Sequence, residues 1–187
     1  MEKKPITEAN AAAAIMDLVF SQVDERWFQV GEPLGRLVAE AGLPPFKDAF
    51  ARFNFSLAAI AANFRILFEL VPREQAERIF TRMLQLLEQQ LGAGPGFAAV
   101  RNAVMKYIEA YNNGIIAIRN PVYDVAMLLY YKVGLDNTAQ RVVDEVYYIP
   151  EPRVVDYLTH ALSMFLNKWE YLLERYALVA PTDSATA

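Results

Sequence analysis

The stretch PFKDAFARFNFSLAAIAANFRILFELV, residues 45–71, predicts a long amphipathic helix and with it the fold class. Its large apolar residues recur three and four positions apart, which is the repeat of one helix face. They are Phe46, Phe50, Phe53, Leu57, Ile60, Phe64, Leu67 and Val71. We expect a helix over 45–70 whose apolar stripe, with Phe53, Leu57, Ile60 and Phe64 at its centre, lies in the main core.

A second stretch, residues 151–177, repeats this spacing. Its apolar positions are Val155, Leu158, Leu162, Phe165, Trp169, Leu172 and Tyr176. A stripe that stays on one side for so many turns is what helix-bundle packing requires. We therefore expect 45–70 and 151–177 to be the two long central helices.

Prolines divide the rest of the chain, since proline is tolerated in a first helical turn and disrupts later ones. Further helices are expected at 7–29, 33–41, 72–91, 96–113, 121–133 and 137–147. The prediction is an all-α, single-domain bundle of seven to eight helices, essentially free of sheet. It covers residues 1–180, followed by a flexible C-terminal tail at 181–187.

The composition is apolar for a soluble protein, with 55% hydrophobic and 21% charged residues among 187. Such values exclude intrinsic disorder. The apolar surplus suggests either a subunit interface or a ligand cavity. The first helix offers candidate interface positions. They are Ala12, Met16, Val19, Val23 and Trp27 along one side, with Ile15, Leu18 and Phe20 beside it.

Charge and cysteine content exclude other classes of protein. The formal net charge is −4, with 18 basic residues spread along the chain, so nucleic acid is not an expected partner. There is no cysteine, and a reducing cytoplasm is the simplest location. The most apolar stretch, 53–64, would rise about 18 Å as a helix, short of a bilayer core of about 30 Å. No integral membrane span is expected.

The sequence contains no recognisable catalytic or metal-binding motif. His160 is the only histidine, and Asp156 lies one helical turn before it. A triad needs a nucleophile and a metal centre needs more ligands, and the sequence supplies neither. The glycine-rich segment at 92–96 lacks the lysine and hydroxyl residue of a phosphate-binding loop. We expect no catalytic residue, metal or cofactor.

Two groups of polar residues are weak candidates for ligand binding. Arg52 and Asn63 lie on a polar strip of the helix at 45–70, which either pairs with a neighbouring helix or lines a cavity. Tyr107, Tyr111, Asn112 and Arg119 gather around the end of the helix at 96–113. Arginine there can cap that helix or present its guanidinium to a carboxylate.

Three functional interpretations follow. The first is a non-enzymatic helical interaction or scaffold protein, a homo-oligomer or the partner of another protein. The second is a helical module that binds an apolar or amphipathic small molecule in an inter-helix cavity. The third is an enzyme without a recognisable sequence motif.

Overall fold

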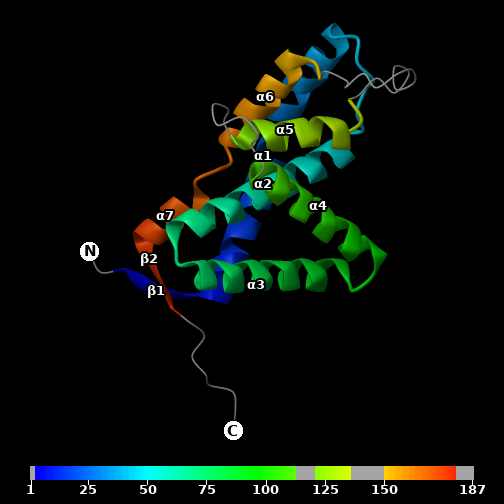
Figure 1. Cartoon of the computed structure of the whole chain (residues 1–187). Coiled ribbons are helices and arrows are strands. Elements are labelled where there is room, and N and C mark those ends of the chain that lie inside the picture. Colours follow the sequence, from blue (N-terminus) through cyan, green and yellow to red (C-terminus); the bar gives the residue numbers. More distant parts are fainter. Residues whose placement is uncertain (1–2, 113–120, 136–149, 180–187) are drawn as a thin grey trace.

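The computed structural model describes residues 3–112, 121–135 and 150–179, and these are mainly helical (Figure 1). The elements in chain order are β1 (Lys4–Thr7), α1 (Glu8–Glu40), α2 (Asp48–Leu70), α3 (Arg73–Leu91), α4 (Pro95–Asn112), α5 (Pro121–Lys132), α6 (Pro152–Ser163), α7 (Lys168–Arg175) and β2 (Tyr176–Val179). The all-α prediction is confirmed. The predicted helix at 137–147 and the tail at 181–187 lie outside the described residues.

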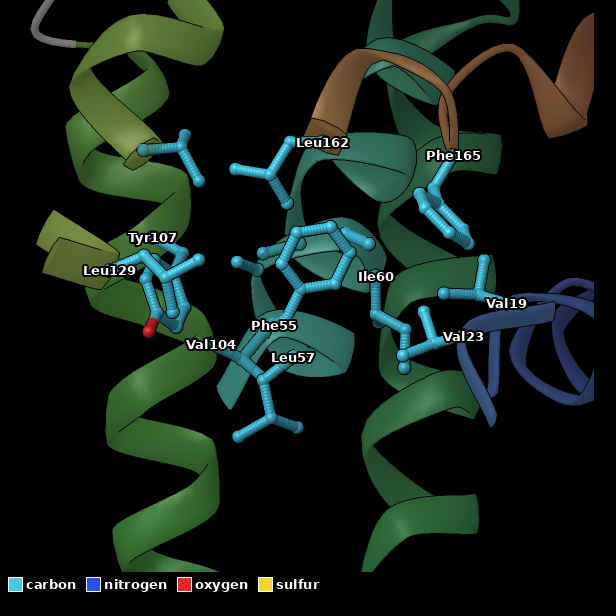
Figure 2. Packing of buried hydrophobic residues seen from close by; sticks show 14 of the residues in the cluster. Val19, Val23, Phe55, Leu57, Ile60, Val104, Tyr107, Leu129, Leu162 and Phe165 are labelled. Carbon is cyan, nitrogen blue, oxygen red and sulfur yellow. The ribbon is translucent and has the colours of Figure 1, made fainter. Parts of the chain in front are cut away.

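α2 runs through the centre of the molecule and contacts α1, α4 and α5 most closely. Leu57, Ile60 and Phe64 are at most 1% exposed, as the spacing predicts, and Figure 2 shows Leu57 and Ile60 between neighbouring helices. The prediction is wrong for the first turns of the stripe. Phe50 is 49% and Phe53 38% exposed, because no described helix covers this end of that face.

The predicted break before Pro33 is wrong, because α1 continues through it as one helix of 33 residues. Proline has no N–H to donate to the carbonyl four residues earlier, here that of Gln29. The Tyr157 hydroxyl of α6 supplies the missing donor, at 3.3 Å from the Gln29 oxygen and 2.9 Å from that of Val30. A side chain distant in sequence thus stabilises the helix at its proline.

The predicted continuous helix over 151–177 is also wrong. α6 ends at Ser163 and α7 begins at Lys168, with Asn167 in the left-handed conformation at φ 62°. Asparagine is among the few residues that tolerate this conformation. α1 is thus one helix where two were predicted, and α6 and α7 are two helices where one was predicted. The predicted division into seven to eight helices therefore does not match the structure.

A small two-stranded parallel sheet, which the sequence did not indicate, joins the two ends of the described chain; the fold is otherwise helical, as expected. β1 and β2 pair in the register Lys4 with Tyr176 through Thr7 with Val179. They lie side by side at the lower left of Figure 1. Parallel strands need a long connection, and the helical part of the chain provides it. Each strand has only four residues, too few to show a recognisable alternation.

Six of the eight expected interface positions of the first helix belong to the core, and Leu18 and Phe20 are partly buried. The six are Ala12, Ile15, Met16, Val19, Val23 and Trp27, and each is at most 6% exposed. Neighbouring helices cover α1 on more than one side, which explains why its apolar surface is wider than one packed face requires.

Candidate functional site

The polar strip on α2 is occupied by structural pairs at its N-terminal end. Trp27 Nε1 donates a hydrogen bond to Asp48 Oδ1 at 2.7 Å, and Arg52 Nη1 lies 3.3 Å from Asp24 Oδ1. Both pairs connect α2 to α1. Arg52 therefore lies on a seam between two helices and not in a cavity with the other candidates.

Asn63, fully buried further along α2, connects to the break between α6 and α7. Its Nδ2 donates to the carbonyls of Ala59 and Phe165, each at 2.8 Å. The Lys168 N–H donates to Asn63 Oδ1 at 3.2 Å. Both the side-chain NH2 group and the side-chain oxygen of Asn63 thus have protein partners, so the role of Asn63 is structural.

The structure brings Tyr111 and Asn112 together around Arg65, a residue that sequence analysis did not select. Arg65 Nε donates a hydrogen bond to Asn112 Oδ1, and Arg65 Nη1 lies 3.3 Å from Glu69 Oε1. The guanidinium carbon also lies 5.7 Å from the centroid of the Tyr111 ring, within cation–π range. Three groups from two helices hold this cation in place.

A surface hollow of about 450 Å³ adjoins this arginine, between α2 and α4. We call it the Arg65 groove. Its lining residues are Arg65, Phe68, Glu69, Arg73, Ile108 and Asn112. Phe68 and Ile108 are partly buried apolar walls, whereas the Arg73 side chain is 85% exposed. The groove combines a positive charge with an apolar surface.

Tyr107 lies away from the groove, in the core. It is fully buried, and Figure 2 shows it next to Leu129 of α5. Its hydroxyl has no hydrogen-bond partner within the part of the chain that the structure describes. Burial raises the pKa of Tyr107 well above its ordinary value. Arg119 lies outside the described residues.

The sequence does contain a signal for Arg65. It is a cation inside the most apolar helix, with Glu69 four residues later at ion-pair spacing. The contribution of α4 is absent from that local pattern, because Asn112 and Tyr111 approach Arg65 only after the chain has folded.

Another charged pair joins α1 to α3. Glu8 is 3% exposed, and Arg78 donates to it through Nε at 3.0 Å and Nη2 at 2.7 Å. Gln75 Nε2 donates to the same carboxylate at 3.2 Å. The hydrogen bonds from Arg78 are the main reason that the pKa of Glu8 is lowered, against the opposing effect of burial. This is a structural anchor at the start of α1.

His160 and Asp156 are both exposed on α6, and the structure places no hydrogen bond between them. Within residues 3–112, 121–135 and 150–179, no three histidine or acidic side chains gather as a possible metal site. Among these residues α2 is the one helix long and apolar enough to cross a membrane, and 67% of its apolar window is buried in the protein. A core helix passes the same test of length and composition.

Comparisons of the chain with protein-family models, with curated proteins and with solved structures gave no match.

Proposed function

We propose that this chain is a non-enzymatic helical interaction protein that self-associates through the surface where α1 meets the start of α2. The observation that carries this proposal is the exposure of three large aromatic side chains. Phe28 is 65%, Phe50 49% and Phe53 38% exposed. Aromatic residues are enriched at protein interfaces.

The ion pair of Asp24 with Arg52 brings the start of α2 against α1 beside Phe28. Phe28 lies one helical turn after Asp24 on α1, whereas Phe53, which directly follows Arg52, is turned about 100° from it around α2. A hollow of about 440 Å³ between the two helices is lined by Phe28 and Arg52, among others. We call this region the α1–α2 seam.

Charge favours a second copy of the chain as the partner. The seam carries acidic Asp24, Glu32 and Asp48 as well as basic Arg52. In a two-fold contact each surface meets itself, so a patch with both signs can place opposite charges against each other. Phe28 would supply apolar burial at the seam, with Phe50 and Phe53 exposed on the neighbouring side of α2.

The rival use of the apolar surplus, an internal ligand cavity, has less support. The apolar space between α1, α2, α5 and α6 has about 170 Å³ of empty volume and no room for a water molecule. Ligand pockets usually measure about 300–1,000 Å³. Binding at the surface Arg65 groove is the second candidate function.

Sedimentation equilibrium at micromolar concentrations tests self-association. The wild-type chain should show a species heavier than 21.1 kDa, and the double variant Phe28→Ser/Phe53→Ser should raise the dimer dissociation constant at least tenfold. Met105→Ser is the matched control, because Met105 is a 44% exposed apolar residue within α4. A monomeric wild-type chain over the whole range, or equal effects of both variants, would refute the proposal.

A further inference from the structure

We propose that the Arg65 groove binds a small amphipathic monocarboxylate, with the carboxylate on Arg65 and the apolar chain against Phe68 and Ile108. This site is separate from the α1–α2 seam and does not depend on self-association. The groove's volume of about 450 Å³ lies within the range of small-molecule sites.

Arg65 is prepared for an anion by the contacts that hold it. Its side chain is 27% exposed and is fixed by Glu69, Asn112 and the Tyr111 ring. A guanidinium has five N–H donors, and Arg65 directs Nε and Nη1 to these partners. Its other guanidinium nitrogen, Nη2, makes no hydrogen bond within the described part of the chain. A cation already held in one conformation loses little entropy when a ligand binds.

The balance of charge in the groove selects a single negative charge. Arg65 and Arg73 contribute two positive charges to the lining and Glu69 one negative charge, but Arg73 pairs with Glu77 at 2.8 Å, which leaves Arg65 as the cation that faces a ligand. A monocarboxylate neutralises this charge, and its two oxygens match the planar guanidinium. A dianion would face Glu69 without full compensation.

The apolar walls select the rest of the ligand. Phe68 on α2 and Ile108 on α4 line the groove and also contact the hydrophobic core. Covering them removes apolar surface from water, which favours an aliphatic or aromatic group joined to the carboxylate. Neither a free inorganic anion nor an uncharged chain would use both features.

Calorimetric titration of the full chain with octanoate tests the site, with octan-1-ol and inorganic phosphate as comparison ligands. We expect saturable octanoate binding at least tenfold tighter than that of either comparison ligand. Loss of saturable octanoate binding in the millimolar range would overturn the proposal, as would equal binding of the alcohol or of phosphate.

Variants locate the binding. Arg65→Gln should weaken octanoate binding at least tenfold, whereas Arg36→Gln, at a 68% exposed arginine on α1, should change it less than twofold. Ile108→Glu places a negative charge in the groove while leaving Arg65 and its partners unchanged, and should also weaken binding at least tenfold. Circular dichroism checks that each variant is folded. The proposal would be overturned if folded Arg65→Gln bound octanoate within twofold of wild type. If Arg65→Gln does not fold, the same result for folded Ile108→Glu would overturn it.

Discussion

Replacing Asn63 by alanine should destabilise the protein far more than removing another buried polar group from the same helix. Asn63 connects α2 to the break between α6 and α7, accepting from Lys168 N and donating to the Phe165 carbonyl. Asn63→Ala leaves both backbone groups without this partner. The third bond, to the Ala59 carbonyl, is within α2, where that oxygen keeps its helical partner.

The expected loss is worked from these two groups. A buried polar group left unsatisfied costs about 1–3 kcal/mol. Phe165 is 2% exposed, so its carbonyl takes the full penalty, whereas Lys168 is only partly buried and its N–H can turn to water. We expect Asn63→Ala to lower the free energy of unfolding by about 2–4 kcal/mol, a large part of the 5–15 kcal/mol typical of a domain.

Urea unfolding followed by circular dichroism measures this loss. At a slope of about 2 kcal/mol per molar urea, a loss of 3 kcal/mol lowers the midpoint by about 1.5 M. Ser56→Ala is the control, because Ser56 is 2% exposed and bonds only to the Arg52 carbonyl of its own helix. That variant should change stability by less than about 1 kcal/mol. Equal losses in the two variants would refute the assigned role of Asn63.

Four further predictions concern stability. Leu57→Ala should cost about 2–5 kcal/mol in chemical denaturation, since Leu57 is 1% exposed. Tyr157→Phe should cost about 1 kcal/mol in the same assay by removing the donor that compensates the proline in α1. Gly31→Ala should lower the melting temperature, because a Cβ there would lie 2.9 Å from an indole nitrogen, whereas Gly35→Ala should raise it. Glu8→Gln should lower the free energy of unfolding by about 1–2 kcal/mol at pH 7 and make it fall less steeply as the pH is lowered.

The sign of the Glu8 prediction follows from its lowered pKa. The folded state holds the Glu8 carboxylate charged to a lower pH than the unfolded chain does. Its stabilising effect is complete above the ordinary pKa of glutamate, about 4.3, and is lost as the pH falls through the folded value. Unfolding free energies between about pH 5 and 3 should decline more steeply for wild type than for Glu8→Gln. Parallel curves would contradict the assignment.

Specific results would contradict the other three predictions. A loss below about 1 kcal/mol for Leu57→Ala would place this side chain outside the main core. An unchanged Tyr157→Phe would mean that water satisfies the carbonyl at the proline equally well. If Gly31→Ala and Gly35→Ala changed the melting temperature alike, close approach of the Trp27 ring would not be the cause.

The candidate site shows which of its residues local sequence spacing can predict. Tyr111 and Asn112 were recognisable because donors cluster at one helix end, and the structure does place them in contact with Arg65. Tyr107, one turn earlier, shares their local pattern but lies in the core, fully buried. Spacing places residues on a helix face, whereas the neighbouring helices decide which part of that face meets solvent.

The sequence by itself determined that the protein is helical and where α2, α3, α4 and α5 lie, because the three-and-four spacing and the proline starts are local. Only the tertiary structure decided whether the other helices continue or break. α1 passes through Pro33 because Tyr157 of α6 compensates the lost backbone donor. The stripe over 151–177 divides because the buried Asn63 amide satisfies backbone groups between α6 and α7 that a continuous helix would pair internally. Backbone hydrogen bonds must be satisfied, but the partner can come from any part of the folded chain, and local spacing does not record it.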